Sequence, residues 1–175
     1  MNYAELLKSN LSRRIIDEIT FTILNDDSKF LELFQLLNHS DYKIAWRATW
    51  ACEKIIENKP TIINDDSFEK IISLTLSTQI VGQRRLLLSI INKLQSNFPI
   101  PPVSIINNCF DWMISEKQPV AVQSLSLKIL TDYCRLEPDL KLELFAYLDN
   151  FGSLLTRPAM ISASKRAIKM LKMND

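Results

Sequence analysis

Residues 41–55, DYKIAWRATWACEKI, carry the pattern of an amphipathic α-helix. At about 100° per residue, one side of this helix collects its apolar and small positions, Ile44, Ala48, Ala51, Cys52 and Ile55. Trp46 and Trp50 fall on the opposite side, at about 200° and 240° from Ile44, among charged residues. The stretch therefore predicts a helix with a buried apolar face and two indoles on its polar face.

The same kind of helix recurs along the chain with a fixed period. Pro60, Pro99 and Pro138 stand 39 residues apart, and each follows a run of apolar residues at helical spacing. The tetrapeptide NDDS occurs at 25–28 and again at 64–67, each time before a further apolar-periodic run, which is typical of a helix N-cap. A period of this length indicates a helical repeat array.

Ten helices arranged as five pairs are predicted. The first helices of the pairs are predicted at 2–9, 28–38, 66–77, 102–116 and 139–149. The second helices are predicted at 11–24, 41–58, 79–97, 119–136 and 158–172. We expect one domain over 1–175, with repeat units at about 1–25, 26–60, 61–99, 100–138 and 139–175.

The second helices align without gaps. Three columns are apolar at every place: Ile15, Ala51, Ile90, Ile129 and Ala167; Ile16, Cys52, Ile91, Leu130 and Ile168; Ile19, Ile55, Leu94, Tyr133 and Leu171. Three other columns, those of Trp46, Trp50 and Glu53, are polar in all other helices: Asn10, Arg85, Ser124 and Ser162; Arg14, Ser89, Lys128 and Arg166; Asp17, Asn92, Thr131 and Lys169. The first set predicts a continuous core, and the second predicts an exposed face.

Residues 41–55 resemble the second helix of a HEAT repeat, with an aspartate before the helix, small residues in its middle and an apolar pair followed by an aliphatic. Residues 119–130 and 81–94 resemble it more loosely, and the resemblance to HEAT and armadillo-type repeats covers most of 28–172. It implies an all-α, right-handed α-α superhelix, a HEAT-like solenoid of about five helix pairs. It also implies that the second helices line the concave surface.

Composition limits the function classes. The chain has 47% apolar and 23% charged residues with a net charge of +1, which is typical of a globular protein without a strong overall field. Only two glycines are present, which argues against phosphate-binding loops. We find no signal-peptide or membrane-spanning pattern and expect a cytoplasmic monomer whose three cysteines are buried free thiols.

Charge is sorted by helix class, with cations in excess on the second helices and acids on the first. The second-helix face thus combines aromatic and basic residues, which suits an acidic peptide or a nucleic-acid backbone. Two interpretations stay open for the tryptophans: they can present a contact surface, or they can pack sideways into the seam between repeats. Arg47, in a column with Leu11 and Leu86, is predicted to make a structural pairing with an acid or to reach the concave rim.

No enzyme site or cofactor is predicted. His39 is the only histidine, and we expect it to be exposed in a loop without zinc ligands nearby. We predict a non-enzymatic module that binds a protein or peptide partner on its concave face through Trp46, Trp50, Arg85, Ser89, Lys128 and Arg166. The alternative is a nucleic-acid-binding repeat protein, including a DNA-glycosylase-like enzyme in which Glu53, near Trp50, supplies the acid.

Overall fold

The structure, a computed structural model, describes residues 2–8, 12–100 and 102–172. The chain is 81% helical, and no strand occurs within these ranges, so the predicted all-α, HEAT-like class is confirmed. The helices form two compact units, residues 1–93 and 94–175, which are described separately below. Asn10, Leu11 and the predicted helix start at residue 11 lie outside the described residues.

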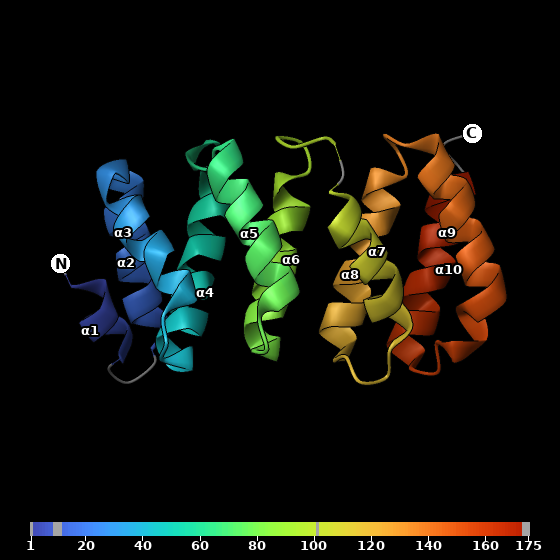
Figure 1. Ribbon diagram of the computed structural model, residues 1–175, viewed down its shortest axis with the longest axis horizontal. Helices are drawn as coiled ribbons and strands as arrows, with labels where there is room; N and C mark the ends of the chain where they lie inside the picture. Colours follow the sequence, from blue (N-terminus) through green and yellow to red (C-terminus); the bar gives the residue numbers. More distant parts are fainter. Residues whose placement is uncertain (1, 9–11, 101, 173–175) are drawn as a thin grey trace. The chain divides into compact units, whose positions relative to one another are not determined.

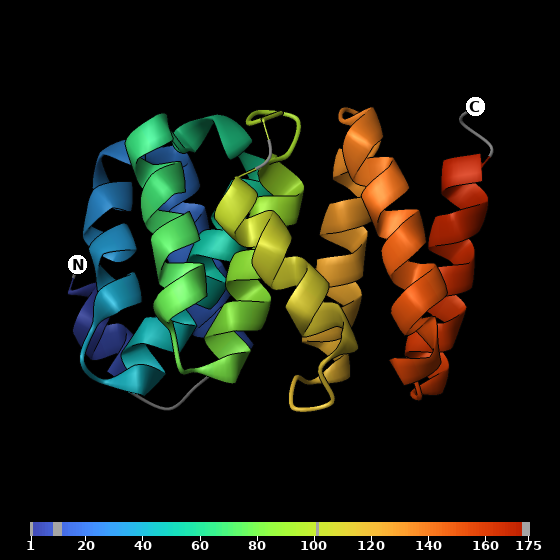
Figure 2. The ribbon, with the colours of Figure 1, turned by 45° about the vertical axis from the view of Figure 1, so that its right-hand side comes forward.

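Unit 1 contains three helix pairs arranged in two layers. Its helices are α1 (Tyr3–Lys8), α2 (Arg13–Asn25), α3 (Phe30–Gln35), α4 (Tyr42–Asn58), α5 (Asp65–Ser77) and α6 (Val81–Leu94), whose last residue belongs to unit 2. Short 3-10 turns add η1 (Asp27–Lys29), η2 (Leu36–Asn38) and η3 (Pro60–Ile62). In Figures 1 and 2, α3 and α5 form one layer over α2 and α4, and α2 packs along α4.

Unit 2 repeats this arrangement with two pairs. Its helices are α7 (Val103–Ile114), α8 (Val120–Tyr133), α9 (Pro138–Phe151) and α10 (Pro158–Lys172), with a 3-10 turn η4 (Gly152–Leu154) before the last. Helix α8 packs against α7, α9 and α10, and α7 and α9 lie in front of α8 and α10 in Figure 1. The second helices α8 and α10 are therefore direct neighbours.

The three apolar columns of the second helices form the core. Thirteen of their fifteen residues are buried, and the other two, Ile15 in α2 and Ile168 in α10, are half-buried. Cys52, Cys109 and Cys134 are buried free thiols, as predicted. Burial raises the pKa of Cys109 and of Cys134 to about 12 and raises that of Cys52 further, so these thiols stay protonated near neutral pH.

The two NDDS tetrapeptides cap helices through different residues. In the second copy, Asn64 is the N-cap of α5, and its side chain accepts the Ser67 N–H at 2.9 Å. In the first copy, α2 runs through Asn25, so Asp26 takes the cap and accepts the Ser28 N–H at 3.2 Å. The two hydrogen bonds of Asp26 with Ser28 and Lys29 lower the pKa of its carboxyl.

A buried glutamine ties two neighbouring helix pairs of unit 1 together, α3/α4 and α5/α6. Gln83 in α6 is 1% exposed, and its Nε2 donates to the Leu37 carbonyl at 2.8 Å and to Thr49 Oγ1 at 3.1 Å. Its Oε1 accepts from Thr78 Oγ1 at 2.7 Å. All of these polar atoms are thereby satisfied away from water, as buried amides require.

One local expectation was refined and one was wrong. The helix predicted at 28–38 is helical over Asp27–Asn38, but it is α only over Phe30–Gln35, with a 3-10 turn on each side. His39 is half-buried rather than exposed, because its Nδ1 accepts the Asp41 N–H at 2.9 Å and thereby orders the turn into α4.

Candidate partner-binding face

The exposed sides of α2, α4, α6, α8 and α10 are here called the second-helix face. Its six predicted contact residues fall into two groups, one in each unit: Trp46, Trp50, Arg85 and Ser89; Lys128 and Arg166. The three cationic residues are exposed, and the two tryptophans and the serine are half-buried. The two groups are therefore considered one unit at a time.

The two tryptophans stack on each other. The centroids of their rings lie 6.3 Å apart, with 26° between the planes. Trp46 also leans on α6, where the position of a Cβ on Gly82 lies 3.0 Å from the indole Nε1. This nitrogen is buried and has no acceptor among the described residues. Trp46 thus fills the seam between α4 and α6, and Trp50 lies over it with the Lys54 ammonium 5.9 Å from its ring centroid.

Ion pairs join neighbouring second helices of unit 1. Lys54 in α4 donates to Asp17 in α2, and this hydrogen bond is the main reason why the pKa of the Asp17 carboxyl is lowered. One pair further along, Glu53 in α4 accepts from Lys93 Nζ at 2.7 Å and from Ser89 Oγ at 2.8 Å, both in α6. The carboxylate of Glu53, considered above as a catalytic acid, and the hydroxyl of Ser89 are therefore engaged within the chain.

Arg47 has a structural role. Its Nη1 donates to the carbonyl oxygen of Leu7 at 2.5 Å. Leu7 lies in the last turn of α1, where carbonyls have no partner within their own helix, so the guanidinium helps to fix α1 on α4. The predicted structural pairing of Arg47 thus includes a backbone carbonyl of α1.

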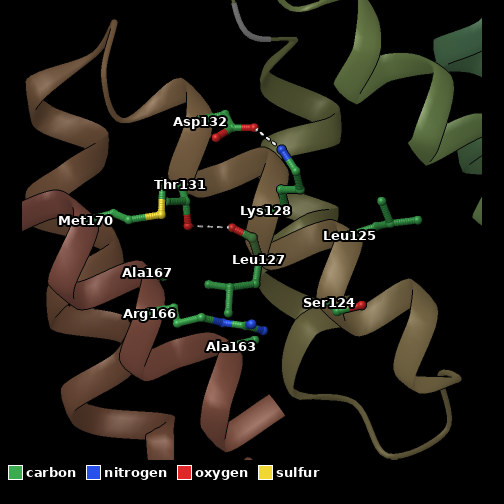
Figure 3. A pocket seen from close by; sticks show the side chains of 10 residues that line it. All are labelled: Ser124, Leu125, Leu127, Lys128, Thr131, Asp132, Ala163, Arg166, Ala167 and Met170. Carbon is green, nitrogen blue, oxygen red and sulfur yellow. Dashed lines mark hydrogen bonds and ion pairs between the residues drawn. The ribbon is translucent and has the colours of Figure 1, made fainter. Parts of the chain in front are cut away.

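A groove separates α8 from α10 in unit 2 (Figure 3). Its volume is about 320 Å³, and five of its lining residues are apolar: Leu125, Leu127, Ala163, Ala167 and Met170. Lys128 and Asp132 form an i,i+4 ion pair of 2.6 Å on the α8 side. Arg166 extends from α10 toward α8 in Figure 3. The structure thus brings Lys128 and Arg166, two of the predicted contact residues, to the rim of one apolar hollow.

Thr131 corrects the expectation of a uniformly exposed polar column. It is equivalent to Glu53 in the alignment of second helices, yet it is only 4% exposed. Its hydroxyl donates to the Leu127 carbonyl at 2.7 Å. A threonine can satisfy its own hydroxyl on the preceding helical turn in this way, so a polar residue type did not require solvent exposure.

Neither the groove nor the role of Gly82 was predicted from the sequence. One signal for Gly82 was present, because an isolated glycine in a helical pattern often marks a close approach by another group. No comparable signal existed for the groove. A groove between two helices depends on the size of the side chains that face each other across the pair. The apolar pattern of one helix does not contain this information.

Within the described residues, no cluster of histidine, cysteine and carboxylate side chains has the arrangement needed to hold a metal ion. None of the helices in the described ranges combines the length and the apolar character needed to cross a bilayer.

Comparison with known proteins identifies the family. The HEAT repeat domain model matches residues 3–171, which is nearly the whole chain. Neither the curated proteins nor the solved structures gave a match.

Proposed function

The chain belongs to the HEAT repeat family, whose repeats generally mediate protein–protein interactions and are typically non-enzymatic scaffolds, and we propose that it binds a protein partner through its second-helix face. The observation that carries this proposal is the groove between α8 and α10. It is a concave, mostly apolar hollow with charged groups at its rim, the usual character of a protein recognition site.

The predicted contact residues take unequal parts in this proposal. Lys128 and Arg166 stand at the groove, and Arg85 is exposed on α6, so these three cations can meet a partner directly. Trp50 offers a half-buried ring, as aromatic anchors at interfaces do. Trp46 and Ser89 act mainly through the chain itself, because the indole rests on Gly82 and the serine hydroxyl donates to Glu53.

The test compares charge reversals on the second-helix face with the same reversals at exposed sites away from it. The double variant Arg85→Glu, Arg166→Glu alters the second-helix face of both units. The matched control Lys70→Glu, Lys117→Glu makes the same change in net charge at exposed sites on α5 and before α8. Partners are captured from cell extract with each protein and quantified, after circular dichroism has verified equal helicity and melting.

We expect the second-helix variant to lose specific partners that the control retains. If the two variants capture the same set as the unaltered protein, binding through the second-helix face is refuted. Capture of nucleic acid that weakens steeply with added salt would instead support the alternative of a nucleic-acid-binding repeat protein.

A further inference from the structure

The two units treat the seam between neighbouring second helices differently. In unit 1, α4 places Trp46 and Trp50 at the seam with α6, and the stacked indoles fill it. Two repeats later, the equivalent positions of α8 are Ser124 and Lys128, and both line the open groove beside α10. The groove therefore occupies the place that the chain's own tryptophan side chains take in unit 1.

Among the described residues, the ion pair that bridges second helices in unit 1 has no counterpart in this seam. Lys54–Asp17 joins α2 to α4, and Lys93–Glu53 joins α4 to α6 through the same two alignment columns. In the seam between α8 and α10 these columns hold Thr131 and Met170, which line the groove. Because Thr131 and Met170 are uncharged, they form no ion pair across the groove (Figure 3).

The size of the groove suits a single large side chain. Its volume of about 320 Å³ lies at the lower end of ligand pockets, which span roughly 300–1,000 Å³. Ala163 and Ala167 on α10 supply a wall of small residues, and Leu127 closes it from α8. An aromatic ring buries more apolar area than any other side chain and would replace the indoles that this seam lacks.

The surroundings of the groove favour an anionic partner. Helix α10 contains four cations, Lys165, Arg166, Lys169 and Lys172, all exposed, and no acidic residue. Among the described residues, no carboxylate lies within ion-pair distance of any of the four. Asp132, the one acid among the described residues that line the groove, is paired with Lys128. Carboxylates flanking an inserted ring would meet these cations.

We infer that the groove between α8 and α10 binds an acidic peptide segment of the partner, with one aromatic side chain inserted between Leu127 and the alanines of α10. Arg166 pairs with a carboxylate next to the aromatic residue and also lies over the ring, as Lys54 lies over Trp50 in unit 1. This inference rests on the proposed function and specifies which chemistry the partner presents.

The test uses short fluorescein-labelled peptides and the whole chain, with binding followed by anisotropy. The probe peptide is composed of aspartate, glutamate and serine around one central tryptophan. A second peptide replaces the tryptophan by alanine, and a third replaces each acid by its amide. We expect the probe to bind, and each replacement to weaken binding by at least about tenfold.

Four protein variants locate the binding. Ser124→Trp sets an indole where Trp46 stands in unit 1 and is expected to block the groove, whereas Ser124→Ala leaves it open. Arg166→Glu reverses the rim charge and is expected to weaken binding by about tenfold or more. Lys117→Glu makes the same charge change in the loop between α7 and α8, away from the groove, and should leave the affinity within about twofold.

The possible results separate this inference from the function on which it rests. Absence of binding at low salt, or binding that Ser124→Trp and Arg166→Glu do not weaken, overturns the inference. If the peptide fails to bind while partner capture still depends on the second-helix face, the proposed function stands and only the peptide chemistry is wrong. If the peptide binds in the groove but captured partners ignore every second-helix variant, the proposed function falls.

Discussion

A double-mutant cycle between Gly82 and Trp46 tests how the tryptophans are held. A Cβ added at Gly82 would lie 3.0 Å from the Trp46 Nε1 and 3.4 Å from its Cδ1. The first distance is tighter than ordinary van der Waals contact and the second is at its lower limit, so the indole must move by a few tenths of an ångström. Its movement is opposed by the stacked ring of Trp50.

The expected magnitude follows from two opposing effects. Alanine in place of glycine stabilises a helix interior by about 1 kcal/mol, and by about half of that at Gly82, because this residue is the second of α6. Overpacking typically costs about 1–3 kcal/mol, and we take about 1 because the indole is half-buried and can yield outward. Gly82→Ala should thus destabilise the unaltered chain by about 0.5 kcal/mol and stabilise the Trp46→Ala variant by about 0.5 kcal/mol.

The free energy of unfolding is measured by urea titration for the four members of the cycle. Circular dichroism at the helix band is the readout, because tryptophan fluorescence would change with the mutation itself. We expect a coupling energy of about 1 kcal/mol. Equal stabilisation by Gly82→Ala in both backgrounds would refute the contact between Trp46 and α6, and with it the account of how the seam in unit 1 is filled.

Three further predictions concern the buried polar groups, the helix caps and the thiols. Gln83→Ala should lower the free energy of unfolding by about 3 kcal/mol, because it removes three hydrogen bonds and leaves a cavity. The control Gln79→Ala, at an exposed residue, should change it by less than about 0.5 kcal/mol. Equal effects of the two variants in urea titrations would contradict the hydrogen-bond network of Gln83. Asn64→Ala should cost about 1 kcal/mol through loss of the N-cap of α5, while Asn25→Ala, at a residue that caps no helix, should cost less in the same assay. All three cysteines should resist a thiol reagent in the folded chain at pH 8 and react fully in guanidinium. Their raised pKa values keep the thiols protonated, and burial blocks the access of the reagent. Rapid labelling of the folded chain would contradict this expectation.

The raised thiol pKa values also make the stability of the folded chain depend on pH. The unfolded cysteines lose their protons near their ordinary pKa of about 8.5, whereas the folded ones hold them to about pH 12 or above. The folded state therefore binds more protons than the unfolded state between these values, and the contribution of the thiols to stability falls as pH rises through this window.

Much of the fold followed from one helical pattern and its period. The apolar columns depend on which residues repeat at about 3.6 positions, and this property is local to the chain. Helices α4 and α5 accordingly begin and end within about a residue of their expected bounds, and α10 matches them. The N-cap at Asn64 was likewise visible in its tetrapeptide.

Predictions failed where the answer depended on a second segment. The identical tetrapeptide at 25–28 caps through Asp26, because α2 extends one residue further and absorbs Asn25. Thr131 is buried although its column is polar, on a helix, α8, against which α10 packs. The group that Arg47 contacts, a carbonyl of α1 forty residues earlier in the chain, likewise could not be read from its own helix.

The sequence by itself determined the helix class, the pairing of helices and the side of each second helix that enters the core, because burial of an apolar stripe is decided by spacing along one chain segment. Only the tertiary structure decided which seams are filled and which are hollow. Trp46 packs against Gly82 in unit 1, whereas the smaller Ser124 at the equivalent position lines an open groove beside α10. This difference arises from the fit between side chains on two helices, and packing of that kind is a property of the pair and not of either sequence alone.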